Sequence, residues 1–204
     1  MTKMIKGTPE VVAGRREEIM NACERLYRNM SFKEITLKEI GNELPFSRPT
    51  IYNYFESKEE IFIGLFEREY RLWVKDLEMI EAKADTLAEQ IAQTLEPRAL
   101  MLRLLSVNLC DMEENSRIER LVEFKQAYGA AMETFDRLLQ EAFPQWTDTD
   151  CRETLVAAFQ FLHGVYPYAH ATAKQCEAME RAGVRYDNKS IYELSLIGLN
   201  KILR

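Results

Sequence analysis

The chain has 204 residues, with 27 Lys and Arg against 33 Asp and Glu, so its formal net charge is -6. This length suits one long helical unit or two modest domains whose core needs no covalent cross-link. The four cysteines are widely separated and lack Cys-x-x-Cys spacing, which favours reduced thiols in a cytoplasmic protein and excludes a disulfide-built secreted domain.

The chain opens with a weakly patterned segment and then a helix. Residues 1–14 show no sustained period, so we expect a flexible arm, followed by a first helix from Arg15. Thr36 and Glu39 have the spacing of a capping box, which predicts the start of a second helix. Pro45 is expected to end it, because the residue before a proline is pushed out of the α region.

A short helix is predicted after this proline. Ser47 has the position of a cap for a helix over residues 48–54, and Ser57 with Glu60 repeats the capping-box spacing at the next helix. A helix this short cannot stand alone in water, so neighbouring helices must hold it. Its outward side chains are donors, one cation and two phenols, which are suited to base edges and phosphates: Arg48, Thr50, Tyr52, Asn53 and Tyr54.

In this stretch the sequence resembles the tetracycline-repressor (TetR) family of bacterial transcription regulators. The resemblance is strong from Arg16 to about Glu69. The residues that match the family pattern are Thr36, Ile40, Ser47, Thr50, Ile51, Tyr52, Tyr54, Phe55, Ser57, Lys58 and Glu59. Gly41 departs from the family's usual alanine, and Pro45-Phe46 replaces the usual Gly-Val of the turn, which bears on the tilt of the short helix.

The resemblance implies a role for each residue of the helix-turn-helix. The residues that would face bases are Arg48, Pro49 and Tyr52. Those that would meet phosphates are Thr36, Thr50, Tyr54 and Lys58, and Ser47 and Asn53 complete the expected DNA-binding set. A Tyr-x-Tyr-Phe cluster can also form a packing core, but the coincidence of three capped helices, a turn and outward polar residues favours DNA contact.

The charge is divided unevenly along the chain. Residues 1–58 carry 10 Lys and Arg against 8 Asp and Glu, while the remaining 146 residues carry 17 against 25. A basic N-terminal part followed by an acidic remainder fits phosphate contact that is confined to the N-terminal part. An unevenly charged solvated surface would give the same numbers.

The rest of the chain reads as helices, which predicts an all-α fold of about nine helices. The expected spans are 57–80, 85–95, 98–112, 117–143, 148–172 and 190–203, with a partly helical connector over 174–189. We expect a DNA-binding domain over residues 1–60 and a helical ligand-binding and dimerisation domain over 61–204. The apolar run 99–110 is interrupted by polar residues and is too short to span a membrane.

A ligand pocket is one interpretation of the polar and aromatic residues in the second domain. Arg103 and Asn108 lie inside an apolar helix, where a buried cation or amide must be paired or face a polar cavity. Together with them, the candidate lining residues are Phe124, Tyr128, Met132, Phe159, His163 and Tyr166. Core packing is the favoured alternative for these aromatic residues. A zinc site is not expected, because His163 and His170 are too far apart along a helix to share one ion.

The sequence therefore predicts a DNA-binding regulator and not an enzyme, with no cofactor. The last two long helices each have two apolar faces and a glycine, Gly164 or Gly198, so we expect them to form a homodimer. The resemblance implies a repressor that binds a palindromic operator and is released by a small-molecule effector. The alternative is a ligand-binding or adaptor dimer that does not bind DNA.

Overall fold

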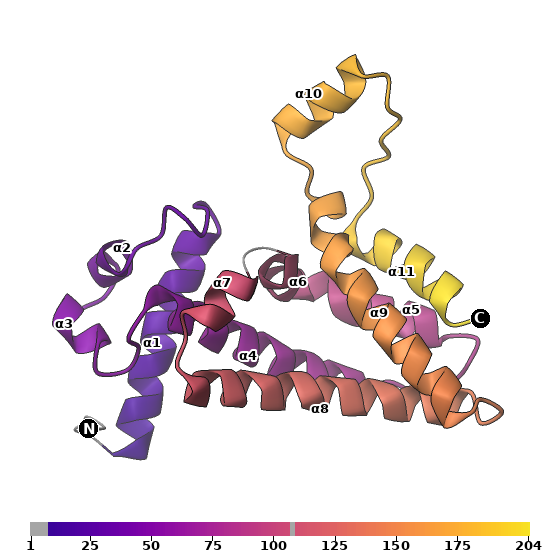
Figure 1. Ribbon diagram of the computed structural model, residues 1–204, viewed down its shortest axis with the longest axis horizontal. Helices are drawn as coiled ribbons and strands as arrows, with labels where there is room; N and C mark the ends of the chain where they lie inside the picture. Colours follow the sequence, from indigo (N-terminus) through magenta and orange to yellow (C-terminus); the bar gives the residue numbers. More distant parts are fainter. Residues whose placement is uncertain (1–7, 107–108) are drawn as a thin grey trace. The chain divides into compact units, whose positions relative to one another are not determined.

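The computed structural model describes residues 8–106 and 109–204, and over these residues it consists of helices and connecting loops without β-strands (Figure 1). This confirms the all-α class. The elements are α1 (Pro9–Tyr27), α2 (Leu37–Asn42), α3 (Arg48–Ile51), α4 (Lys58–Glu78), α5 (Leu87–Leu95), the 3-10 helix η1 (Glu96–Arg98), α6 (Ala99–Ser106), α7 (Leu109–Glu114), α8 (Ile118–Ala142), α9 (Asp148–Ala169), α10 (Ala173–Arg181) and α11 (Ile191–Ile202).

The first helix begins earlier than the sequence pattern indicates. Pro9 opens α1, so the expected arm over residues 1–14 is helical from that point. Proline suits the first helical position, because its missing amide hydrogen would have no partner there and its fixed φ matches the helix. The expected helix over 98–112 is divided among η1, α6 and α7, and the connector 174–189 contains α10.

The helices form two compact units, residues 1–68 with 108–126 and residues 69–107 with 127–204. The division differs from the boundary expected at residue 60, because the start of α4 and the segment leading into α8 pack with the N-terminal helices. In this first unit the Phe62 ring lies edge-on to Tyr27 and Phe32, at centroid distances of 5.0 and 4.8 Å. Phe66 stacks on Phe124 at 4.9 Å.

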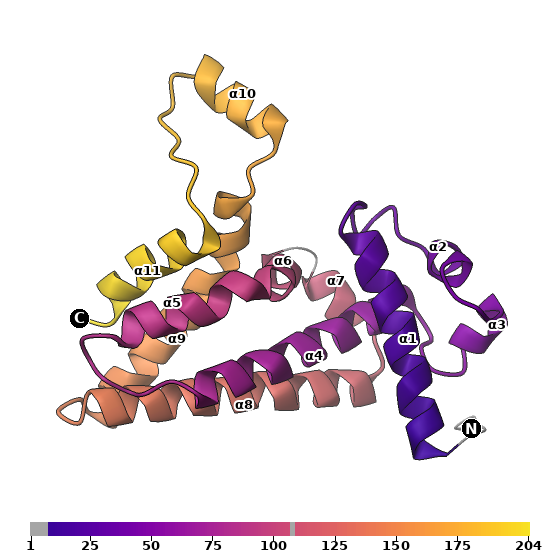
Figure 2. The same ribbon diagram turned by 180° about the vertical axis from the view of Figure 1, so that it is seen from behind.

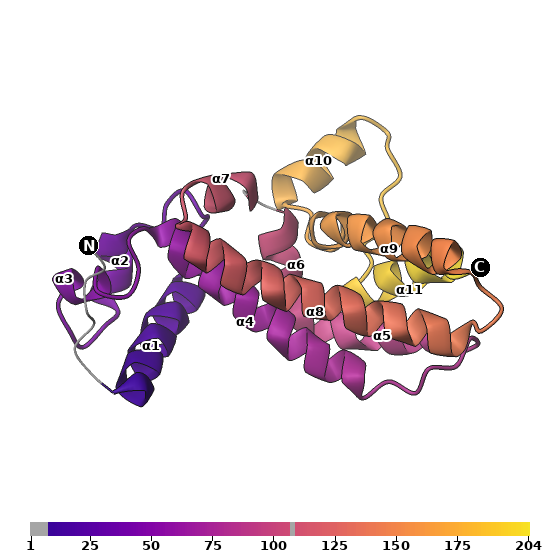
Figure 3. The same cartoon turned by 60° about the horizontal axis from the view of Figure 1, so that its bottom comes forward.

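The second unit is built around Trp73 of α4. Its indole Nε1 donates to Thr94 Oγ1 at 2.9 Å, and its ring lies near the rings of Phe135 and Phe159. The C-terminal part of α4 runs beside α8 (Figure 3). Helix α11 packs on α5 and α9 (Figure 2), whereas α10 stands apart from both α9 and α11. None of the helices in the described part of the chain has the apolar length needed to cross a membrane.

Candidate DNA-binding interface

The predicted cap of α2 is present. Thr36 Oγ1 accepts from the backbone N–H groups of Lys38 and Glu39, at 3.2 and 3.4 Å. The Lys38 side chain is exposed in the first turn of the same helix. Backbone amides at a helix start favour anions, so Lys38 belongs to the candidate interface. Its place two residues after a capping threonine was the available sequence signal.

Helix α3 is shorter than predicted and lacks the predicted side-chain cap. Ser47 occupies the predicted N-cap position, but its hydroxyl lies 3.2 Å from Thr50 Oγ1 and makes no cap hydrogen bond. The α-helix ends at Ile51 instead of Tyr54. Beyond it the chain forms a turn, with Asn53 N–H donating to Thr50 O at 3.1 Å and Tyr54 N–H to Ile51 O at 2.9 Å.

Buried side chains and one glycine set the position of α3. Ile51 and Phe55 are fully buried, as their spacing predicts. Gly41 lies directly under α3, since a Cβ there would be 3.3 Å from Arg48 Cβ. The glycine therefore permits a close approach of α2 and α3 that alanine would crowd. In the turn, the Arg15 guanidinium covers the ring of Phe46 at 4.7 Å.

The outward residues of this motif form one exposed set. We refer to these residues as the reading surface: Thr36, Ser47, Arg48, Pro49, Tyr52 and Asn53. Thr50 is half-buried beside them. The Arg48 guanidinium donates to Tyr52 Oη at 3.1 Å and lies 5.9 Å from the centre of that ring. The tyrosine thus orients the cation while leaving its other N–H donors available.

Two predicted phosphate contacts have other roles. Tyr54 is only 6% exposed, because it follows Ile51 by three positions and so points to the same buried side. Lys58 Nζ donates to the carbonyl oxygens of Phe32 and Ile35, at 2.7 and 2.9 Å. The Lys58 ammonium group is therefore held by the loop before α2. Neither Tyr54 nor Lys58 belongs to the reading surface.

A buried carboxylate joins the start of α4 to the start of α8. Glu60 is 1% exposed and accepts from Arg117 Nε and from its terminal nitrogen, at 2.5 and 2.7 Å. The backbone N–H of Glu56 adds a third bond at 2.8 Å. Burial alone would raise the pKa of Glu60, but these hydrogen bonds hold it below the usual value for glutamate. The sequence indicated only a capping role for Glu60 and did not indicate Arg117.

Both parts of the chain match known families. Residues 19–65 match the family of bacterial regulatory proteins, tetR family. Residues 67–187 match the tetracyclin repressor-like, C-terminal domain, and this match alone spans more than half of the chain. The chain belongs to the TetR family. It is therefore a DNA-binding transcriptional regulator and not an enzyme.

Several proteins are similar to this chain in sequence or in fold. The uncharacterized HTH-type transcriptional regulator YfiR of Bacillus subtilis is 27% identical over 146 residues, which cover 69% of this chain and 71% of YfiR. The fatty acid degradation regulator FadR from Bacillus halodurans has a TM-score of 0.61 at 16% identity, over 98% of this chain and 97% of that one. FadR from Bacillus subtilis, solved with stearoyl-CoA, has the same TM-score and identity over 92% and 97%.

In this TetR-family chain two of the predicted pocket residues are packed into the core. Phe159 is 5% exposed and packs against Trp73, Phe135 and Tyr128, so it belongs to the core. Phe124 is also buried, in the first unit. Helical periodicity indicates that a residue faces inward, but it does not indicate whether it will meet a cavity or another ring.

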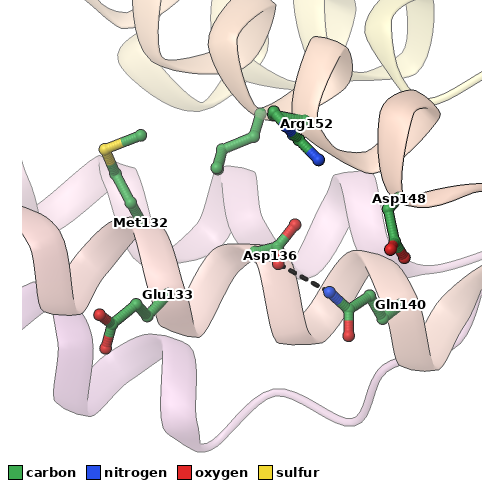
Figure 4. Close-up of a pocket in the computed structure, with 7 residues that line it drawn as sticks. Met132, Glu133, Asp136, Gln140, Asp148 and Arg152 are labelled. Carbon is green, nitrogen blue, oxygen red and sulfur yellow. Dashed lines mark hydrogen bonds between the residues drawn. The ribbon is translucent and has the colours of Figure 1, made fainter.

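The other described candidates differ in their exposure and in their neighbours. His163 is exposed, with Nδ1 3.1 Å from Leu105 O, and Tyr166 stacks on His170 at 4.3 Å. Arg103 is half-buried, and Asn108 lies outside the described residues. Met132 lines a hollow of about 370 Å³ between α8 and α9, whose other walls are mostly charged. Figure 4 shows Arg152 from α9 over Asp136, which accepts from Gln140 at 2.7 Å.

The two glycines of the predicted dimer helices differ in their surroundings. A Cβ at Gly198 would lie 2.3 Å from the Phe161 ring of the same chain, so this close approach is intramolecular. Gly164 has nothing within 4 Å of a Cβ. Gly198 therefore serves the packing of α11 on α9, which corrects its expected role at a dimer contact.

Proposed function

We propose that the chain is a repressor that binds a palindromic operator as a homodimer and releases it when a small molecule binds. Family membership supports DNA binding. The observation that carries the proposal is the reading surface, in which a cluster of exposed polar groups stands on the buried side chains of Ile51 and Phe55.

The reading surface contains the groups that each part of a duplex requires. The Arg48 guanidinium can donate two parallel hydrogen bonds to the O6 and N7 of a guanine. The hydroxyls of Thr36 and Ser47 suit phosphate oxygens, as does the Lys38 ammonium at the start of α2. Arg48 would then select sequence, while the residues around it would set the position of the helix on the backbone.

Arg48→Ala tests this division of roles. The matched variant is Lys38→Ala, which also removes one positive charge. We expect Arg48→Ala to cost about 1–3 kcal/mol at one base pair and to relax discrimination there. Lys38→Ala should weaken all duplexes similarly and reduce the salt slope by about 1. Titrations of operator and scrambled duplex across salt measure both effects. Equal losses on both duplexes for Arg48→Ala would show that it does not read bases.

The alternative, a dimer of this fold that does not bind DNA, makes an opposite prediction. Selection of duplexes from a random library by the wild-type chain should enrich a two-fold symmetric sequence if the repressor proposal is correct. No enrichment, from protein that is folded and dimeric, would favour the alternative. The intact reading surface favours the repressor.

The homodimer is supported by apolar side chains that α9 and α11 leave uncovered. Val156 of α9 and Ile197 of α11 are 45% and 50% exposed. Self-association about a two-fold axis would cover such surfaces on both chains at once. It would also present two reading surfaces to the two halves of a palindrome.

We propose that the effector is mostly apolar and binds the second unit, where aromatic side chains are dense. FadR from Bacillus subtilis was solved with stearoyl-CoA, which makes that compound the first probe to test. If binding weakens operator affinity tenfold, the probe must bind DNA-free protein tenfold more tightly, about 1.4 kcal/mol of coupling. Probe affinity is measured with and without operator, and equal affinities would rule out this compound as the effector.

A further inference from the structure

Helix α10 is specified by sequence signals at its N-terminus. Thr172 Oγ1 accepts from the Gln175 backbone N–H at 3.2 Å, and Gln175 Oε1 accepts from the Thr172 N–H at 2.8 Å. These two bonds form a complete capping box. The start of the helix is therefore determined by its own residues.

The C-terminus of α10 is specified equally well. Gly183 has a φ of +67° and donates its N–H to Glu180 O at 3.1 Å. The N–H of Val184 donates to Met179 O at 2.9 Å. This pair of bonds is the Schellman motif, in which a glycine in the left-handed region ends the helix.

Within the described part of the chain, no other helix covers α10. None of the residues of α10 is buried. Figures 1 and 2 show α10 held away from α9 and α11 by an extended segment on each side. A nine-residue helix is marginal in water without tertiary packing, so its well-defined ends imply a surface that covers it.

One side of α10 is suited to such a surface. Cys176, Met179 and Ala182 follow one another at intervals of three and lie on one side. The opposite side carries charges, including the Arg181–Glu177 ion pair. The helix is amphipathic, and its apolar side is uncovered within the chain.

Exposed apolar side chains also occur on the two helices that flank α10. Among the described residues of the second unit, the large apolar side chains that are exposed, apart from Met79, are Val156 and Tyr168 of α9, Val184 after α10, and Ile197 of α11. The segment 170–190, here called the arm, leaves the end of α9 and returns to the start of α11. The arm is therefore joined at both of its ends to the helices of the proposed dimer surface.

We infer that the arm of each chain docks, through Cys176, Met179 and Ala182, onto the α9–α11 surface of a second copy of the chain. This inference rests on the proposed homodimer. A second copy is the fitting occupant, because each chain carries both the amphipathic arm and the apolar surface that would receive it. A two-fold axis then buries both pairs of surfaces with one operation.

Native cysteines provide the first test. Cys110 and Cys176 are exposed, whereas Cys23 and Cys151 are buried. In Cys110→Ser the reactive thiol is Cys176, and its rate of reaction with an aromatic disulfide reagent should fall in step with the fraction of dimer as protein concentration rises. In the control Cys176→Ser, the rate at Cys110 should not depend on concentration.

A matched pair of substitutions provides the second test. Met179→Gln places an amide on the apolar side of α10, while Glu177→Gln places the same residue on the charged side. Methionine and glutamine have similar helix propensities, so the helix itself should persist. We expect Met179→Gln to raise the dimer Kd about tenfold or more and Glu177→Gln to leave it unchanged, as measured by sedimentation equilibrium.

The outcomes separate this inference from the homodimer. A wild-type monomer at every concentration would overturn both. A dimer in which Cys176 reacts at a concentration-independent rate and Met179→Gln has no effect would keep the homodimer and overturn the docked arm. Protection of Cys176 that persists in the monomer would show that the arm folds against its own chain, which also overturns the inference.

Discussion

Lys58 shows how one side chain can serve the fold where a DNA contact was expected. Its Nζ donates to the carbonyl oxygens of Phe32 and Ile35 and lies 4.4 Å from the centre of the Phe32 ring. Carbonyl oxygens at the end of a turn need donors, and a single ammonium satisfies two of them. The residue therefore fastens the start of α4 to the loop that precedes α2.

Lys58→Ala is expected to lower the free energy of unfolding by about 1–3 kcal/mol, since it removes the ammonium group that donates to both carbonyl oxygens. The control is Lys33→Ala, an exposed lysine in the same loop, which should stay within about 0.5 kcal/mol of wild type. Urea denaturation measures both. An unchanged urea midpoint for Lys58→Ala, together with weaker binding to every duplex, would restore the phosphate role.

Glu60 predicts a dependence of stability on pH. Despite its burial, hydrogen bonds from Arg117 and from backbone N–H groups keep the pKa of Glu60 below its value in the unfolded chain. A lowered folded-state pKa means that the stabilisation is complete above the unfolded value of about 4.3 and is lost as pH falls through the folded value.

Glu60→Gln tests this account. The amide cannot accept from Arg117 as a carboxylate does, so we expect a loss of about 1–3 kcal/mol at neutral pH that shrinks toward acid. The neighbouring half-buried Glu59→Gln is the control. Urea midpoints from pH 7 to pH 3 supply the measurement. A constant difference between Glu60→Gln and wild type over this range would contradict the role of its ionisation.

At the scale of elements, the packing of α11 on α9 depends on one missing side chain. Glycine is a poor helix former, so Gly198 in the interior of α11 makes the helix less stable than alanine would. Close packing at this position can offset that loss. The Phe161 ring of α9 fills the space where a Cβ would be. The Phe161 ring therefore packs into the space left by the missing side chain of Gly198.

Gly198→Ala is expected to cost about 1–3 kcal/mol, because the Phe161 ring must move. The matched control is Gly129→Ala in α8, where a Cβ would meet nothing within 4 Å. That change should stabilise the chain by about 0.5–1 kcal/mol through helix propensity. Thermal unfolding of both variants compares them directly, and a stabilised Gly198→Ala would show that the ring contact is not constraining.

At the scale of the whole molecule, the charge distribution limits where DNA can bind. The net charge of -6 is repulsive toward phosphates, whereas residues 1–58 carry a small positive balance. Affinity must then come from a few local contacts on each head. In the proposed homodimer, two DNA-binding domains would multiply such contacts, since binding of the second becomes intramolecular.

We therefore expect a palindromic operator to bind at least about a hundredfold more tightly than a duplex of equal length with one half-site replaced. Fluorescence anisotropy at one fixed salt concentration measures the ratio, because affinities at different salt are not comparable. Equal affinities for the two duplexes would mean that a single head carries the binding, and would remove the argument for a palindromic operator.

The sequence by itself determined those features that depend on neighbours along the chain. Thr36 caps α2, Ile51 and Phe55 point inward, and Arg48, Tyr52 and Asn53 point outward, because capping and helical periodicity operate within a few residues. The same local signals predicted the all-α class and the helix-turn-helix that places the chain in the TetR family.

The tertiary structure alone decided which partners those side chains meet. Lys58 binds carbonyl groups more than twenty residues away, Glu60 pairs with Arg117, and Phe159 packs against the Trp73 ring. Periodicity specifies the side of a helix on which a residue lies, but not the element that packs there. That choice depends on contacts between distant segments, whose energies are set only when the helices come together.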